Sequence, residues 1–215
     1  MKIWDISRTL SNEFAEWPGD EPFHYRLTNE IAKGASVNLG AIRMSVHNGT
    51  HADARFHFDT NGEPIEKAPL DLYLGRVTVV DLSQSFSRLK EKHLITLEDL
   101  RPQAEEIAAT SRLLVKTGRW SDSTVFPEKI PVLAADVPVW LQKNGVKLLG
   151  VDLPSVDEID SKSLQNHQAL ARTGIAIIES LDLSEVPAGV YNFAALPLKI
   201  AGADGAPVRA VLWRD

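Results

Sequence analysis

Short apolar runs bounded by turn residues constrain the fold of this chain more than any other feature. Runs of this length, with alternating or continuous apolar residues, are typical of β-strands. The sequence contains eight of them, at residues 3–6, 37–46, 77–82, 113–116, 148–151, 175–178, 191–196 and 208–213. Segments with helical spacing separate the later runs, which predicts a mixed α/β domain with its functional residues on the connecting segments.

The clearest helix is predicted to begin directly after Thr96. Apolar residues recur there at helical spacing, at Leu97, Leu100, Ala104, Ile107 and Ala108. Thr96 and Asp99 resemble a capping box, in which each side chain binds the backbone N–H of the other residue.

Two further helices are predicted at residues 134–144 and 161–172. Gly145 directly follows the first and Gly174 lies near the end of the second, and glycine is common just beyond a helix C-terminus. Pro138 lies within the first segment and leaves its starting residue undefined, because proline interrupts the hydrogen bonds of a helix interior.

Length and composition predict one globular domain over residues 1–215. A chain of 215 residues with 44% hydrophobic and 24% charged residues can bury a substantial core. Neither a repeat nor a low-complexity linker divides it.

Charge and residue usage exclude several kinds of partner. The net charge of −6 and the lack of basic runs with interleaved aromatics argue against nucleic acid. No apolar segment approaches the roughly 20 residues of a membrane span, and the N-terminus lacks a signal-peptide pattern. We therefore expect no membrane association and a cytoplasmic location. The chain has no cysteine, so a metal would be bound by imidazole and carboxylate groups, which favours zinc or manganese.

The segment HNGTHADARFHF, residues 47–58, contains three of the six histidines and is the main candidate for a metal site. A helix would separate its polar residues, because Asp53 would lie about 200° from His51 around the axis. A straight strand would place His47 and His51 about 13 Å apart, too far for one ion. We therefore expect a bend, with Gly49 supplying the unusual backbone angles of a tight turn.

Residues outside this segment must complete such a site. His167, on the predicted helix at residues 161–172, and Glu179, at the end of an apolar run, are the best candidates. A carboxylate that ends a buried strand is costly unless it is paired or bound to a cation. The alternatives are a solvated helical histidine, a loop glutamate and, for the whole segment, histidines clustered without a function.

The same segment resembles a known signature. HNGTHADARFHF is similar to the His-x-Gly-Thr-His-x-Asp-x-Pro-x-His-Phe signature of the metal-dependent cyclase-like hydrolases, and the whole chain resembles the bacterial kynurenine formamidases (arylformamidases). The resemblance implies a single mixed-sheet domain of the swivelling β/β/α type. Other matching stretches are WDIS at 4–7, WPGD at 17–20, SVN at 36–38, LLGVDLPSVD at 148–157, NHQ at 166–168 and ALPLKIAGADGAPVRAV at 195–211.

Members of this family hydrolyse N-formyl-L-kynurenine to L-kynurenine and formate in tryptophan degradation, with a two-zinc site in a homodimer. The resemblance implies that His47 and His51 bind one zinc ion and His167 the other. It also implies that Asp53 and Glu179 contribute to both. Manganese is the alternative metal, because the same ligands suit either ion.

The resemblance also implies a catalytic and a substrate-binding residue. His57 would be the acid and base, since an imidazole can accept and return a proton near neutral pH. Trp17 would line the substrate pocket, and a simple hydrophobic plug is the alternative. Pro18 and Gly19 suit the central positions of a type II turn.

Two residues depart from the family pattern. Members often carry a second histidine where this chain has Gln168, which leaves the inferred ligand His167 intact. Arg55 replaces a proline and so frees the backbone next to His57. We expect Arg55 to point outward as a solvated side chain; the alternative is contact with a substrate carboxylate or a neighbouring acid.

Other functions stay open from the sequence. A relative that opens isatin or another small cyclic amide or lactone would carry the same motif. A non-catalytic zinc protein is the alternative outside enzymes, although a structural site does not need the extra base His57. GADGAP, residues 202–207, is expected to be a loop without a nucleotide, because it lacks the P-loop lysine and the dinucleotide fingerprint.

Overall fold

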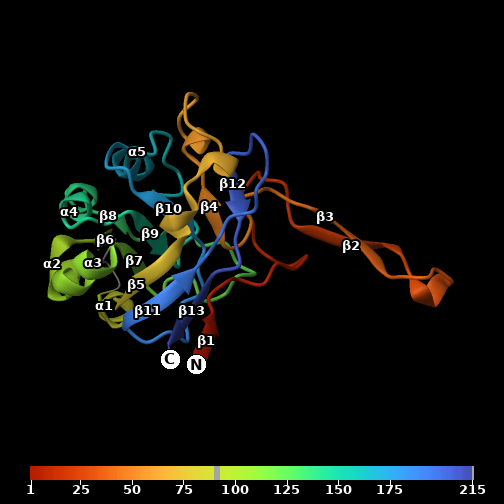
Figure 1. Ribbon diagram of the computed structural model, residues 1–215, viewed down its shortest axis with the longest axis horizontal. Helices are drawn as coiled ribbons and strands as arrows, with labels where there is room; N and C mark the ends of the chain where they lie inside the picture. Colours follow the sequence, from red (N-terminus) through yellow and green to blue (C-terminus); the bar gives the residue numbers. More distant parts are fainter. Residues whose placement is uncertain (90–92, 215) are drawn as a thin grey trace.

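A nine-stranded mixed sheet forms the centre of the protein in the computed structural model, which describes residues 1–89 and 93–214 (Figure 1). Its four adjacent strands β5, β7, β9 and β10 are parallel, and the strands on both sides of them pair antiparallel. The predicted mixed α/β class is therefore confirmed. In spatial order the strands are β1 (Lys2–Asp5), β13 (Val211–Arg214), β11 (Gly189–Ala194), β5 (Leu74–Asp81), β7 (Arg112–Lys116), β9 (Leu148–Val151), β10 (Ala176–Glu179), β4 (His51–Asp53) and β12 (Gly205–Pro207).

Seven of these strands lie within two or three residues of a predicted run, whereas β4 and β12 were not predicted. Both have only three residues, too few to show a period in the sequence. They form because β4 pairs with β10 on one side and with β12 on the other. These two strands carry or adjoin much of the candidate site.

The helices are short, and most lie together on one side of the sheet (Figure 1). The capping box of Thr96 and Asp99 is confirmed. The helix that follows is divided by a 3₁₀ turn that contains Pro102, whose ring cannot donate a helical hydrogen bond. The helices are α1 (Ser83–Arg88), α2 (Leu97–Leu100), α3 (Ala104–Thr110), α4 (Val137–Lys143) and α5 (Gln165–Arg172).

Two predicted helices begin later than expected. Helix α4 begins at Val137, which places Pro138 in the first turn, where its missing N–H is not needed. Helix α5 begins at Gln165 and keeps the predicted end. The 3₁₀ turns are η1 (Ile31–Lys33), η2 (Arg55–His57), η3 (Ile65–Lys67), η4 (Leu70–Tyr73) and η5 (Arg101–Gln103), the last of which contains Pro102.

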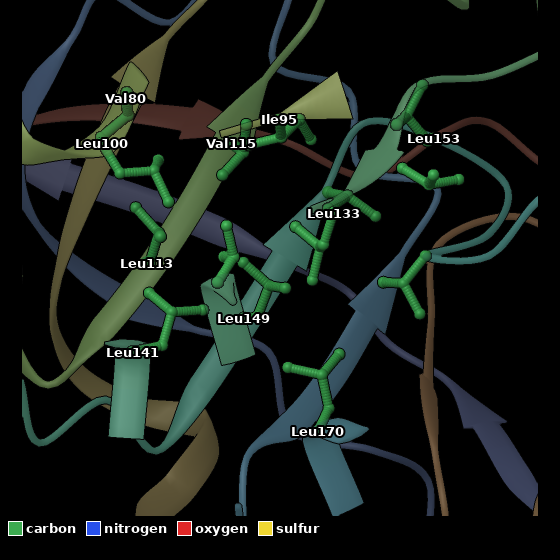
Figure 2. Packing of buried hydrophobic residues seen from close by; sticks show 14 of the residues in the cluster. Val80, Ile95, Leu100, Leu113, Val115, Leu133, Leu141, Leu149, Leu153 and Leu170 are labelled. Atoms are coloured by element: carbon green, nitrogen blue, oxygen red, sulfur yellow. The ribbon is translucent and has the colours of Figure 1, made fainter. Parts of the chain in front are cut away.

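Apolar side chains cover both faces of the central strands. Successive residues of a strand point to opposite faces, so the continuous apolar runs of β7 and β9 are typical of buried parallel strands. Figure 2 shows the cluster between the sheet and the helices, which includes Leu113, Val115, Leu149, Leu141 and Leu170. A second cluster on the opposite face contains Leu114, Leu148, Ile178, Phe193 and Leu212.

Two smaller sheets complete the fold. Strands β6 (Leu94–Ile95) and β8 (Val132–Leu133) pair in parallel. Strands β2 (His24–Asn29) and β3 (Leu39–Arg43) form an antiparallel hairpin that projects far from the nine-stranded sheet (Figure 1); we call residues 24–43 the arm. The run at 37–46 predicted β3, but β2 was not predicted. None of the described helices is long and apolar enough to cross a bilayer.

Candidate metal centre

The strand β4 places His51 and Asp53 in the candidate site. Both lie on the same side of the strand, because side chains alternate. Its partner β10 ends at Glu179, which is the register partner of His51. The predicted bend precedes the strand, and Gly49 has a φ of 67°, in the left-handed region that favours glycine. This bend brings the ring of His47 to 4.9 Å from that of His51, centroid to centroid.

Asp53 and Glu179 each direct one carboxylate oxygen towards His51 and the other towards His167. Asp53 Oδ1 lies 3.2 Å from His47 Nδ1 and 3.4 Å from His51 Nε2, whereas Asp53 Oδ2 lies 3.3 Å from His167 Nε2. Glu179 divides in the same way, with Oε2 at 3.5 Å from His51 Nε2 and Oε1 at 3.4 Å from His167 Nε2. The five predicted ligands therefore lie together, and each carboxylate directs one oxygen to each side of the centre.

The centre is buried, and some of its polar atoms have no hydrogen-bond partner in the part of the chain that the structure describes. The side chains of His51, Asp53, His167 and Glu179 are only 2–5% exposed. Among the described residues, His51 Nε2 and both Asp53 carboxylate oxygens accept or donate no hydrogen bond. An unsatisfied buried polar atom costs about 1–3 kcal/mol, and a bound cation would satisfy all three. Imidazole nitrogens and carboxylate oxygens suit zinc or manganese, so the donor set fits a metal.

The three histidines predicted as ligands, His47, His51 and His167, each have their second ring nitrogen held by a protein oxygen. A histidine ligand of a metal usually donates its other N–H in this way, which fixes the orientation of the ring. The contacts are His51 Nδ1 to Gly49 O at 2.9 Å, His167 Nδ1 to Asp157 Oδ2 at 2.7 Å and His47 Nε2 to Asp204 Oδ2 at 2.9 Å.

Electrostatics at the centre favour a positive charge. Burial by itself lowers the pKa of His51, but the neighbouring Asp53 and Glu179 carboxylates outweigh it and raise this pKa to about 10. For Asp53 the effect of burial has the opposite sign and raises the pKa. The surrounding imidazoles outweigh burial and hold the pKa of Asp53 well below its usual range. The carboxylates therefore stay ionised and attract a cation.

His57 lies at the exposed side of the centre. Its side chain is 32% exposed, Nδ1 lies 3.3 Å from Asp204 Oδ2, and its ring centroid is 4.1 Å from that of His47. The described residues offer two compact groups of three donors, one of His51, Asp53 and Glu179 and one of His47, Asp53 and His57. The contacts of His57 with Asp204 and His47 therefore place it beside the predicted ligands.

A cavity of about 370 Å³ opens onto these histidines. The predicted turn at Trp17 forms, with Asp20 N donating to Trp17 O at 2.9 Å and a φ of 97° at Gly19. Trp17 lines the cavity and packs edge to face against Phe126, with centroids 5.3 Å apart. Phe14 and Trp120 extend the same aromatic wall.

Several residues at this site were not predicted from the sequence. The aromatic residues Trp120 and Phe126 stand in a polar stretch between predicted elements, which is the one local signal that could have identified them. Asp157 and Asp204 lie in stretches that match the family, at 148–157 and 195–211, but no local feature distinguishes them from other acidic loop residues. The GADGAP prediction was partly wrong: residues 205–207 form β12, and this pairing holds Asp204 next to the histidines.

The two departures from the family pattern, Arg55 and Gln168, lie in the segment of residues 47–58 and on the helix that contacts its end. Arg55 begins η2, its side chain is 55% exposed, and its Nε lies 3.5 Å from Asp59 Oδ2. It therefore points outward as expected, next to an acid. It lines a separate cavity of about 250 Å³. Gln168 donates from Nε2 to Phe58 O at 2.8 Å and so fixes the end of this segment to α5.

Several known proteins are similar to this chain over nearly its whole length. The family model Cyclase, described as "Putative cyclase", matches residues 4–158. A kynurenine formamidase of Geobacillus thermodenitrificans is 44% identical over 213 residues, which are 99% of this chain and 98% of that protein. A kynurenine formamidase of Bacillus cytotoxicus is 41% identical over 209 residues, 97% of this chain and 95% of that protein.

Solved structures agree with the fold. A potential metal-dependent hydrolase with cyclase activity superposes with a TM-score of 0.77 at 26% identity, covering 98% of this chain and 96% of the other. Isatin hydrolase A from Labrenzia aggregata has a TM-score of 0.81 at 22% identity, covering 98% and 93%. At this lower identity, the second likeness concerns the fold alone.

Proposed function

The chain belongs to the cyclase family, and on this premise we propose that it hydrolyses N-formyl-L-kynurenine to L-kynurenine and formate. It is an enzyme of the hydrolase class, like the kynurenine formamidases and isatin hydrolases that it resembles. The observation that carries the substrate is the similarity to kynurenine formamidases, which extends over both chains almost completely. The likeness to isatin hydrolases is more distant and concerns the fold.

Two divalent cations, zinc by preference, would complete the site. His47, His51 and one oxygen of Asp53 would hold the first, and His167 with the other oxygen of Asp53 the second. Glu179 would contribute an oxygen to each, as its distances to His51 and His167 suggest. When bound, the ions would lower the pKa of water from about 15.7 towards 7 and polarise the formyl carbonyl.

His57 would transfer the protons of the reaction. It borders the cavity, and Asp204 holds its Nδ1, so Nε2 is the ring nitrogen without a hydrogen-bond partner among the residues that the structure describes. This nitrogen would accept a proton as water attacks the formyl carbon and return it to the aniline nitrogen as the C–N bond breaks. The products would then be formate and the free aromatic amine.

The aromatic wall would bind the ring of the substrate. Trp17, Phe126 and Trp120 offer flat apolar surface beside the histidines, and aromatic pairs favour offset or edge-to-face contact. A ring held there would place an ortho formamide close to the metal ligands and to His57. Trp17 would thus be a substrate-binding residue.

A direct assay tests this function. The purified, metal-loaded protein is given N-formyl-L-kynurenine and isatin in parallel, and its zinc and manganese contents are measured. We expect turnover of the formamide at a kcat/KM well above that for isatin. Turnover of isatin alone would contradict the substrate, and activity on neither with two metals bound would reject the substrate while leaving the metal site intact.

We further propose that the protein is a homodimer in which the arm contacts the second copy. The pairing of Tyr25 with Ile42 and of Leu27 with Gly40 puts the three large side chains on one face of the hairpin. They are exposed at 46%, 63% and 38% for Tyr25, Ile42 and Leu27. A two-stranded hairpin is marginally stable by itself, so this apolar face needs a cover.

Charge favours a second copy as the cover. Arg26, Lys33 and Arg43, offset by Glu30, give the arm a charge of +2, so the rest of this −6 chain carries −8. A basic arm is therefore attracted to the acidic body of an identical chain. Exchange of two arms between two copies would also satisfy the two-fold symmetry of most homodimers.

A further inference from the structure

Asp204 connects a predicted metal ligand to the predicted acid and base. Its Oδ2 lies 2.9 Å from His47 Nε2 and 3.3 Å from His57 Nδ1, and the two imidazole rings are neighbours. We propose that Asp204 is a positioning residue that sets the orientation and the tautomer of both histidines. This inference rests on the proposed function for the role of His57, but not for the role of His47.

The backbone around Asp204 is held by the sheet. Ala54 N donates to Asp204 O at 2.9 Å, and the next residue, Gly205, is the register partner of Asp53. A Cβ on Gly205 would lie 2.8 Å from His47 Cε1, so only glycine lets the strand approach this ring so closely. The carboxylate therefore has a fixed position relative to β4 and the histidine segment.

The chemistry of a carboxylate determines what this contact does. An ionised carboxylate accepts hydrogen bonds and donates none, so each ring nitrogen that faces Asp204 carries a proton. With a metal bound, the nitrogen of His47 left unprotonated would be Nδ1, which lies 3.2 Å from Asp53 Oδ1 and faces the centre. In a neutral His57 the unprotonated nitrogen is Nε2, which is free to accept a proton. A carboxylate that fixes a histidine tautomer has the same role in metal sites and in catalytic triads.

Asp157 provides a comparison within the same centre. It accepts a hydrogen bond from His167 Nδ1 and two more from backbone N–H groups at the start of α5. Asp157 therefore serves one ligand and one helix, whereas Asp204 serves one ligand and the acid–base group. Loss of Asp204 should consequently affect two separate quantities, the metal affinity and the rate of proton transfer.

The test is Asp204→Asn, measured on the metal-loaded enzyme. The Asn amide oxygen is uncharged, so it accepts the two ring N–H groups less strongly than the Asp204 carboxylate does, and its NH₂ group cannot accept. We expect the zinc affinity, from titration against a competing chelator, to fall by about 10–100-fold. At saturating zinc we expect kcat to fall by a further factor of about 10–100, with KM changed less than about twofold. Unchanged zinc affinity and unchanged kcat would overturn the proposal, as would a loss confined to KM.

A double-mutant cycle separates positioning from a general structural effect. If Asp204 acts on turnover through His57, Asp204→Asn should change kcat less than about twofold in a His57→Ala background. An equal loss in both backgrounds would overturn that route. The zinc titration needs no substrate, so it stays informative about His47 even if the proposed formamide is not hydrolysed.

Two control variants complete the experiment. Glu66→Gln disturbs the same loop, because Glu66 Oε2 accepts from Gly202 N at 3.0 Å; we expect it to keep zinc affinity and kcat. If Glu66→Gln reproduces the losses of Asp204→Asn, positioning by Asp204 is wrong. Asp204→Glu retains a carboxylate and should recover part of both quantities, and a failure to exceed Asp204→Asn would also contradict the proposal, provided that both variants melt near the parent temperature.

Discussion

The metal centre and the arm depart from ordinary burial in opposite directions. At the centre, polar atoms of His51 and Asp53 are buried without hydrogen-bond partners among the described residues. On the arm, Tyr25 and Ile42 expose large apolar side chains. Buried polar groups and exposed apolar patches are the two informative exceptions to the usual distribution. Each indicates a binding partner, which we propose is a pair of cations for the centre and a second copy of the chain for the arm.

The two regions also differ in how they are held. The strand β4 at the centre pairs on both sides, with β10 and with β12. The strands of the arm pair only with each other among the described strands. We therefore expect substitutions at the centre to act on metal and chemistry within an intact fold, and substitutions on the arm to act on association.

The largest effect is expected for His51→Ala. This change removes a nitrogen that faces both Asp53 and Glu179, so the variant should lose bound metal and its activity should fall to background. Elemental analysis of the purified protein and the formamide assay measure the two losses. A variant that keeps its metal and its activity would show that the buried carboxylates serve some other partner.

His57→Ala should separate chemistry from metal binding. Removal of a general acid and base typically lowers the rate by about 10²–10⁴-fold, and we expect a loss of kcat in this range. Because His57 is partly exposed and held by Asp204, the variant should retain most of its metal. Metal loss equal to that of His51→Ala would make His57 a ligand and would contradict this division of roles.

A charge on the apolar face of the arm should weaken the dimer. Burying one large apolar side chain is worth about 1.5–3 kcal/mol, so Ile42→Asp should raise the dissociation constant by about 10–100-fold. Sedimentation velocity over a range of concentrations measures this shift.

Ala41→Asp is the matched control for the arm. Ala41 pairs with Arg26 on the opposite face of the hairpin, so a carboxylate there should leave the dimer within about twofold of the parent. Metal content should be unchanged in both variants. Equal weakening by the two substitutions would reject the apolar face as the contact surface.

The smallest effect is expected for Arg55→Pro. Arg55 is the first residue of η2, a position that proline tolerates, and restricting the unfolded chain should stabilise the protein by about 0.4–1 kcal/mol. Urea denaturation measures this gain. Because the side chain points outward, kcat and KM should stay within about twofold, and a large change in KM would show that Arg55 contacts the substrate.

Local patterns account for much of the fold and for part of the site. The runs that became β7, β9 and β10, the capping box at Thr96 and the turn at Trp17 depend on neighbours in the sequence. The same holds for the bend at Gly49, since only a bend lets His47 and His51 approach one another. Such features can be predicted because their cause lies within a few residues.

Long-range pairing decided the rest. The strand β4 is stable only because β10 and β12 pair with it, and β12 depends on β4 in turn; no three-residue segment carries that information. Their register places Glu179 opposite His51, and Gly205 opposite Asp53.

By itself the sequence determined which side chains could bind a metal, because imidazole and carboxylate are the donors that a chain without cysteine offers. Only the tertiary structure decided how those donors are shared. Asp204 and His57 are 147 residues apart, and their contact depends on the pairing of β4 with β12. The aromatic wall likewise joins Trp17 to Phe126 across the cavity. Residue type is a local property, whereas distance and orientation follow from the register of a folded sheet.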